Sequence, residues 1–340
     1  MTARLVTVFG GNGFVGRHVV QRLAKAGARV RVACRDPEAA IFLKPLGNPG
    51  QIIPVKANIT DKDEVARAVE GADAVVNCVG IIASVGWNTF STVHKFGAAN
   101  IAKATQMAGI ETLVHVSALG ADRNAPSQYA QSKAAGELAT LNAFPNATII
   151  RPAMIIGAED NSLNLFANLA RFSPVIPMIN PLLPSLKMVR GNLYSFLIPT
   201  FEPRPREGSR FQPVVVSDVA DAIMCALNTP ATQGEIYEVA GPTAYSFKAL
   251  MDLMMKNSGR KRCVMSLPAM WAYFWAFFAE FIPGKPFTRD MVTLLNHDNL
   301  PTGDHKNLGD LGLKAHSLES TLPTYMRTYG PPSSRRVRLV

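Results

Sequence analysis

The chain has 340 residues, of which 48% are hydrophobic, so its composition excludes an intrinsically disordered protein and its length allows a nucleotide-binding domain with a second lobe. Its formal net charge of +10 is compatible with nucleic acid or an anionic membrane. No zinc spacing, RNA-binding aromatic motif or DNA-reading helix accompanies this charge, and the four cysteines form no Cys-x-x-Cys pair, so we predict neither a nucleic-acid partner nor a metal site.

The first predicted elements are a strand over residues 5–9, a glycine turn and a helix. Because the strand begins so early, we expect no cleavable signal or transit segment ahead of it. In the turn, Gly10 permits a tight bend, Gly13 lets a phosphate approach the backbone, and Gly16 lets the helix pack closely on the strand. A helix that begins at such a turn directs backbone N–H groups and its positive dipole end at a phosphate. We therefore predict a dinucleotide site.

The residue after the second strand, which starts at Val30, selects between the two nicotinamide cofactors. An acidic residue there would bind the ribose hydroxyls of NAD, whereas an arginine suits a 2′-phosphate. The residue is Arg35, and Arg17 on the first helical turn is a second cation in reach. Asp36 is the competing acidic residue, but its position before Pro37 is typical of a helix N-cap. The sequence therefore favours NADP(H).

Strands and helices continue to alternate through the first half of the chain. The predicted strands are 52–56, 74–77, 112–116 and 147–150, and the predicted helices are 61–69, about 96–107 and 129–141. This alternation indicates parallel βαβ units, and the nearly continuous apolar strands indicate a sheet covered on both faces. The predicted fold class is α/β, a Rossmann-type doubly wound parallel sheet with a smaller C-terminal lobe.

The composition changes at the start of the second half. Residues 174–205 contain seven prolines and therefore cannot form one regular helix. The sequence then predicts a strand at 211–216, a capped helix at 218–228 and a strand at 235–240, which return the chain to the sheet. The expected domains are an NADP-binding Rossmann domain at 1–157 completed by 211–241, a small lobe at 158–210 and 242–330 with a Pro-rich insertion, and a basic tail at 331–340.

Residues 267–287 form the most apolar segment of the chain. The stretch between Pro268 and Pro283 is shorter than the roughly 20 residues that a membrane-spanning helix needs. Its aromatic excess is typical of an interface with a bilayer surface or another protein. Aromatic stripes are also typical of a helix buried in a core, so the sequence leaves both interpretations open.

Three residues have the pattern of a proton-transfer site. Tyr129 and Lys133 are four residues apart on one helical face, where the ammonium would favour the ionised phenol and reach ribose hydroxyls. Ser117 directly follows the strand at 112–116, at the sheet edge where ligands of such folds bind, and would polarise a substrate carbonyl.

These residues, the glycine turn and the segments 75–80 and 149–157 resemble the extended and atypical short-chain dehydrogenase/reductases. More narrowly, segments 79–80, 97–104, 115–118, 132–137 and 211–220 are similar to the short-chain-dehydrogenase-like accessory subunit of respiratory complex I (NADH:ubiquinone oxidoreductase). This resemblance implies an NADPH-binding subunit of that complex, with a mainly structural cofactor.

The resemblance also implies roles for individual residues. It assigns Gly10, Asn12, Gly13, Phe14, Val15 and Gly16 to the pyrophosphate, Arg17 and Arg35 to the 2′-phosphate, Asn58 and Ile59 to adenine, Val79 and Gly80 to the adjoining ribose, and Tyr129, Lys133 and Pro152 to the nicotinamide half. Two positions depart from the enzyme pattern. His94 replaces an asparagine that completes the proton relay in many family members, and Asn58 replaces the usual acidic residue.

The partners implied are complex I subunits and a membrane surface, the latter through segment 267–287 and the insertion at 178–209. The expected location is peripheral, on the cytoplasmic face of a bacterial inner membrane or the matrix face of the mitochondrial one. The alternative is a free-standing NADP-dependent reductase or epimerase for a hydroxyl or carbonyl substrate, with Ser117, Tyr129 and Lys133 handling protons. A nucleotide-binding redox regulator is a third possibility. The sequence does not separate these uses.

Overall fold

The computed structural model describes residues 4–180, 184–190, 195–201 and 208–331, and it describes only the backbone between 180 and 207. The chain forms two compact units. Unit 1 comprises residues 1–162, 212–244 and 299–322, and unit 2 comprises 163–211, 245–298 and 323–340. Part of the predicted insertion at 178–209 and almost all of the predicted basic tail lie outside the described residues.

Unit 1 is built on an eight-stranded sheet in which all neighbouring strands are parallel. The strand order is β16-β13-β6-β5-β4-β1-β2-β3. The bounds are β1 Leu5–Phe9, β2 Arg29–Cys34, β3 Ile52–Lys56, β4 Ala74–Asn77, β5 Leu113–Val116, β6 Thr148–Pro152, β13 Ile236–Val239 and β16 Lys306–Asn307. The chain starts in the middle and proceeds outward in both directions, which is the doubly wound order with its switch point between β1 and β4. The predicted fold class is confirmed.

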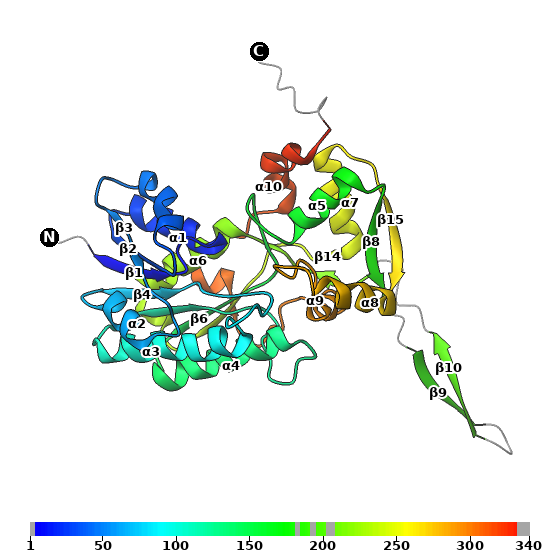
Figure 1. Cartoon of the computed structure of the whole chain (residues 1–340), viewed down its shortest axis with the longest axis horizontal. Coiled ribbons are helices and arrows are strands. Elements are labelled where there is room, and N and C mark those ends of the chain that lie inside the picture. Colours follow the sequence, from blue (N-terminus) through cyan, green and yellow to red (C-terminus); the bar gives the residue numbers. More distant parts are fainter. Residues whose placement is uncertain (1–3, 181–183, 191–194, 202–207, 332–340) are drawn as a thin grey trace, which may run out of the picture. The chain divides into compact units, whose positions relative to one another are not determined.

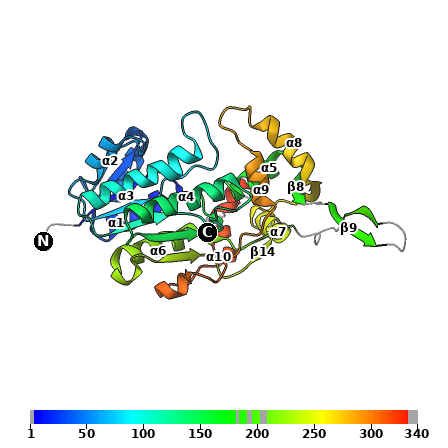
Figure 2. The same ribbon diagram turned by 90° about the horizontal axis from the view of Figure 1, so that it is seen from below.

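Helices cover both faces of this sheet (Figure 1). Helices α1 (Phe14–Lys25) and α6 (Val216–Asn228) pack on one face through residues such as Val19 and Ile223. Helices α2 (Lys62–Val69) and α3 (Ala98–Met107) pack on the other, and α4 (Gln128–Ala143) lies beside α3 (Figure 2). The other elements of unit 1 are η1 Glu38–Leu46, η2 Ser91–Gly97, β7 Ile155–Ile156, β12 Val214–Val215, η3 Pro230–Thr232, η4 Leu308–Leu311 and the first part of α10 (Leu318–Tyr325).

Two predicted elements differ from the structure. The helix expected at about 96–107 is preceded by a π-helix, η2, so that α3 itself begins at Ala98. The strand expected at 211–216 is two short strands, β11 (Arg210–Phe211) and β12, which pair with different partners. Pro213 lies between them and has no N–H for a continuous ladder, so the strand prediction was wrong there.

Unit 2 is smaller and combines short strands with helices. Its helical elements are α5 Leu163–Phe172, α7 Phe247–Ser258, α8 Ala269–Ala279, α9 Arg289–Leu295 and η5 Met326–Tyr329. Its strands are β8 Val175–Asn180, paired with β15 Cys263–Pro268, β9 Pro184–Arg190, paired with β10 Ser195–Phe201, and β11, paired with β14 Tyr245–Ser246.

Helix α8 turns its aromatic side chains outward, except Tyr273, which packs against α9. Its buried residues are Ala272 and Ala276, which pack with Val292 of α9. Its large side chains Met270, Trp271, Phe274, Trp275, Phe277 and Phe278 are between 42% and 72% exposed. The interpretation of this segment as a core helix is therefore wrong. Among the described residues, no helix has both the length and the apolarity to cross a bilayer.

Candidate functional site

The carboxyl end of β1 leads into α1 through a bend that depends on glycine. Gly10 has φ +71°, a left-handed conformation that favours glycine, and its N–H donates to the Ala33 carbonyl at 3.0 Å. A Cβ on Gly16 would lie 2.6 Å from the Gly11 Cα, so only glycine lets α1 start this close to the turn. Gly13 is the N-cap and offers no side chain to the N–H groups of the first turn of α1. These groups are suited to an anion.

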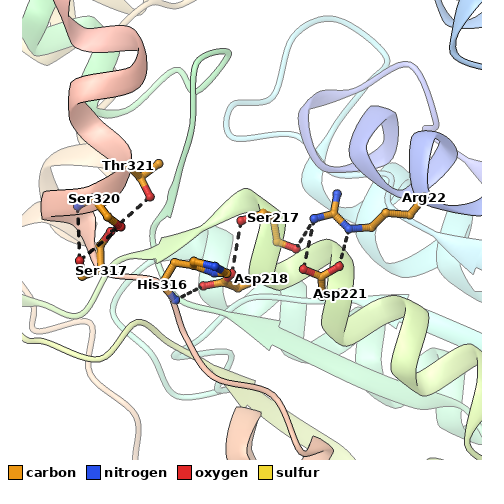
Figure 3. Close-up of polar contacts among 8 residues, drawn as sticks. All are labelled: Arg22, Ser217, Asp218, Asp221, His316, Ser317, Ser320 and Thr321. Carbon is orange, nitrogen blue, oxygen red and sulfur yellow. Dashed lines mark hydrogen bonds and ion pairs between the residues drawn. The ribbon is translucent and has the colours of Figure 1, made fainter. Parts of the chain in front are cut away.

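Helix α1 is held in position by α6 (Figure 3). Arg22 donates to both carboxylate oxygens of Asp221, at 2.5 and 3.2 Å, and to the Ser217 carbonyl at 3.0 Å. Asp218, which directly follows Ser217 on α6, accepts from the backbone N–H of His316 at 2.7 Å. The helix that presents the glycine turn is thus fixed by a bidentate ion pair as well as by apolar packing.

Two arginines lie at the same edge of the sheet as the glycine turn. Arg35 directly follows β2 and is exposed. Arg17 donates from Nε to the Gly13 carbonyl at 3.2 Å and from Nη2 to the Asn12 carbonyl at 3.4 Å. Asp36 accepts from the N–H groups of the first two residues of η1, at 3.1 and 3.4 Å, which is the capping task that the sequence predicted.

The residues assigned to adenine and its ribose follow β3 and β4. Asn58 accepts from the Thr60 N–H at 3.2 Å and from its hydroxyl at 3.0 Å, and Ile59 is buried. Val79 lies beside the glycine turn, since a Cβ on Gly10 would lie 3.1 Å from the Val79 Cγ2. Gly80 follows it. The carboxyl ends of parallel strands thus bring these residues to one edge of the sheet.

The three proton-transfer candidates come from β5 and α4. Ser117 is buried, and its hydroxyl has no hydrogen-bond partner among the described residues. Lys133 donates to the Val116 carbonyl at 3.1 Å, and burial lowers its pKa to about 8. Desolvation raises the pKa of Tyr129 to about 12. The Lys133 ammonium donates to a backbone carbonyl of β5, and its effect on the Tyr129 phenol stays a prediction.

His94 makes a hydrogen-bond network that the sequence did not predict. Its Nε2 accepts from the Ile81 N–H at 3.0 Å, and its Nδ1 lies 2.8 Å from the Ser132 hydroxyl, which donates to the Tyr129 carbonyl at 2.7 Å. This network assigns the proton to Nδ1 and the lone pair to Nε2. Burial, with the nearby Lys133 charge, lowers the pKa of His94 to about 3, so the ring is neutral. Both nitrogens are engaged in hydrogen bonds within the protein.

A buried ion pair connects α4 to β6. Arg151 donates from Nε and Nη2 to the two carboxylate oxygens of Glu137, at 2.8 and 2.6 Å. The pair joins the helix that carries Tyr129 and Lys133 to the strand that ends at Pro152. The sequence analysis missed it, although a charged residue within an apolar strand is a signal for a buried partner.

The arrangement fits a dinucleotide. A Cβ on Gly13 would lie 3.1 Å from the Gly10 carbonyl, so the turn presents bare backbone where a pyrophosphate would approach. Ser117, whose hydroxyl has no partner among the described residues, follows β5, which lies two strands from β1 in the sheet. A bound nicotinamide cofactor would supply hydride chemistry, while these residues bind and orient it.

Comparison with known proteins agrees with this geometry. Residues 10–168 match the NAD(P)H-binding family. Two relatives are the proteins named NADH dehydrogenase (ubiquinone) 1 alpha subcomplex subunit 9, mitochondrial, of Dictyostelium discoideum and Arabidopsis thaliana. The Dictyostelium protein is 29% identical, and the match covers 97% of this chain and 86% of the relative. The Arabidopsis protein is 32% identical, and the match covers 93% of this chain and 75% of the relative. The NADPH-dependent quinone oxidoreductase QOR2 of Escherichia coli, complexed with NADPH, is 17% identical with a TM-score of 0.69, covering 94% of this chain and 99% of that one. At this identity the structural likeness shows the fold alone.

Proposed function

Because the chain belongs to the family of NADH dehydrogenase (ubiquinone) 1 alpha subcomplex subunit 9, we propose that it is an accessory subunit of respiratory complex I that holds NADPH mainly as a structural cofactor. Its proposed place is the surface of the inner membrane, cytoplasmic in a bacterium or matrix-facing in a mitochondrion. The observation that carries the structural role is the network of His94, in which both ring nitrogens are already engaged and the ring is neutral.

The preference for NADPH is supported by the charges around the glycine turn. Arg35 and Arg17 are two cations beside the end of β2, where the 2′-phosphate would lie, and Asp36 is occupied as a helix cap. An arginine binds a phosphate through parallel N–H donors, whereas the ribose hydroxyls of NAD offer these cations no negative charge. The roles of the other predicted contacts, from Asn58 to Pro152, are part of the same proposal.

The proposal of a structural cofactor agrees with the pKa of Tyr129 and the hydrogen bond of Lys133, the two residues assigned to the nicotinamide half. A general acid for carbonyl reduction works best with a pKa near the working pH, whereas the pKa of Tyr129 is about 12. Lys133 is bound to the Val116 carbonyl. We propose that Tyr129 and Lys133 hold the nicotinamide ribose and that no rapid turnover follows.

The first prediction separates cofactor retention from proton transfer. Replacing Arg35 by alanine should weaken NADPH binding at least about tenfold, because charge-assisted hydrogen bonds to a phosphate contribute about 1.5–3 kcal/mol. Tyr129→Phe should weaken NADPH binding less than Arg35→Ala does, since it removes one neutral hydrogen bond of about 0.5–1.5 kcal/mol and no charge. Titration of each purified variant with NADPH and NADH checks this. Equal affinity of the unmodified protein for the two cofactors contradicts the assignment to NADPH.

The outward face of α8 supports a membrane surface as the second partner. Trp271, Phe274, Trp275 and Phe278 lie one or two turns apart and are all about half exposed or more. Such a continuous apolar face is rare on soluble surfaces, and tryptophan and phenylalanine are enriched where an amphipathic helix lies at the headgroup boundary. The helix is too short to span a bilayer, so we propose that it lies in the plane of the membrane surface.

The second prediction tests this face with a matched pair of variants. Trp271→Ser combined with Phe274→Ser should weaken binding to anionic phospholipid vesicles at least about tenfold, because each large side chain contributes about 1.5–3 kcal/mol when fully buried. Trp87→Ser combined with Phe172→Ser removes a tryptophan and a phenylalanine that are even more exposed, at 96% and 84%, and should change binding less than about twofold. Co-sedimentation with vesicles measures both. Equal losses in the two pairs would refute a role for α8.

A further inference from the structure

The guanidinium of Arg17 is held between two segments that follow different strands. The ring of Phe42, in η1, lies under the guanidinium at 5.0 Å from its centroid. A carboxylate oxygen of Glu159, in the segment after β7, lies 3.8 Å from Nη1. The other Glu159 oxygen lies 3.4 Å from the Nε2 of His18. Together with the carbonyls of the glycine turn, these groups fix where Arg17 points.

We propose that Glu159 is an exchangeable counter-ion of Arg17 whose place is taken by the 2′-phosphate of NADPH, and that Phe42 fixes the plane of the guanidinium. The two residues are positioning residues that set the preference for NADPH over NADH. This inference rests on the proposed role of Arg17 in binding the 2′-phosphate.

The geometry of the pair favours exchange. It has a single contact of 3.8 Å, and the Arg17 and Glu159 side chains are 30% and 37% exposed, so water competes with the attraction. A phosphate carries more charge and accepts two parallel N–H bonds from one guanidinium, which makes it the stronger partner. Glu159 keeps His18 as a neighbour when Arg17 turns to the phosphate. A carboxylate that competes with the ligand therefore lowers the apparent affinity for NADPH.

The position of Phe42 favours an orienting role. The ring contacts one face of the guanidinium and leaves its edge to the Gly13 and Asn12 carbonyls and to Glu159, whose place a phosphate would take. Phe42 is about half exposed, so contact with Arg17 accounts for it better than core packing does. Because η1 follows Arg35 after a short capped turn, one segment carries both an arginine for the 2′-phosphate and the ring that orients the other arginine.

A double-mutant cycle tests the role of Glu159. Glu159→Gln should tighten NADPH binding about three- to tenfold, as expected for loss of a weak competing ion pair, and should change NADH binding less than about twofold. In an Arg17→Met background the same substitution should leave the NADPH affinity unchanged. If Glu159→Gln tightens NADPH equally in both backgrounds, Glu159 acts by general repulsion and the proposal is overturned. The proposal is also overturned if Glu159→Gln alone, with Arg17 intact, leaves the NADPH affinity unchanged.

The role of Phe42 has its own test by conservative replacement. Phe42→Leu should weaken NADPH binding about two- to fivefold, while Phe42→Trp, which keeps an aromatic face, should not. Ile41→Ala, at the exposed neighbour, is the matched control and should have no effect. Equal effects of the leucine and tryptophan variants overturn the orienting role. If the unmodified protein binds both cofactors equally, the proposed NADPH function fails first, and that result is distinct from any outcome of these substitutions.

Discussion

Gly16→Ala is expected to destabilise the protein and to abolish tight cofactor binding together. The added Cβ would lie 2.6 Å from the Gly11 Cα, and a backbone atom in a tight turn cannot yield as a flexible side chain does. Overpacking of this kind costs about 1–3 kcal/mol, and the displaced turn no longer aims its N–H groups at a pyrophosphate. Urea unfolding and NADPH titration measure the two effects.

Gly13→Ala is the matched control for this prediction. Its Cβ would meet only the Gly10 carbonyl, at 3.1 Å, so the free energy of unfolding should fall by less than about 1 kcal/mol while NADPH binding still weakens. A Gly16→Ala protein with native stability and native affinity would show that the close approach of α1 to the turn is unimportant.

Arg151→Met is expected to lower the free energy of unfolding by about 3–5 kcal/mol, because it leaves the Glu137 carboxylate buried without its partner. Both oxygens of that carboxylate accept from Arg151, and the two side chains are 14% and 6% exposed. Adding Glu137→Leu should recover most of the loss, since the uncompensated charge is then gone. Urea unfolding of the single and double variants checks this.

A surface pair provides the control for the buried one. Lys248 and Asp252 form an ion pair at 2.8 Å with both side chains about half exposed, so Lys248→Met should cost less than about 1 kcal/mol. Similar costs for Arg151→Met and Lys248→Met would mean that the α4–β6 pair does not hold the candidate site together.

The features that the sequence predicted best are local ones. A strand, three glycines and a helix within the first 25 residues define the turn by themselves, and the order of strands and helices implies the doubly wound sheet. The capping role of Asp36 also follows from its immediate neighbours and is confirmed. In each case the residues that interact are close together in the chain.

The features that were missed depend on partners far apart in the chain. His94 is neutral because of its burial and the nearby Lys133 charge, and its two ring nitrogens meet Ile81 and Ser132, which the fold brings to them. Glu137 and Arg151 belong to different elements. The same holds for Lys133, whose ammonium donates to the Val116 carbonyl on β5. Residue spacing on one helix gives no information about these contacts.

Helix α8 was ambiguous for a different reason. Aromatic residues occupy most of its positions, so its composition does not say which face is buried. The informative residues are the two buried alanines, Ala272 and Ala276, which are four apart and let the helix approach Val292 closely. The bulky residues are then left on the outer face, where they need a partner.

The central claim is that this chain holds NADPH within respiratory complex I. The most direct measurement is to isolate complex I from membranes of cells that carry an affinity-tagged copy of the chain and to quantify the nucleotide released on denaturation. We expect the tagged chain to purify with the complex and to release one NADPH per copy, about as much after incubation with excess NADH as before. Recovery of the chain as a small soluble species, or with NADH in place of NADPH, would contradict the account.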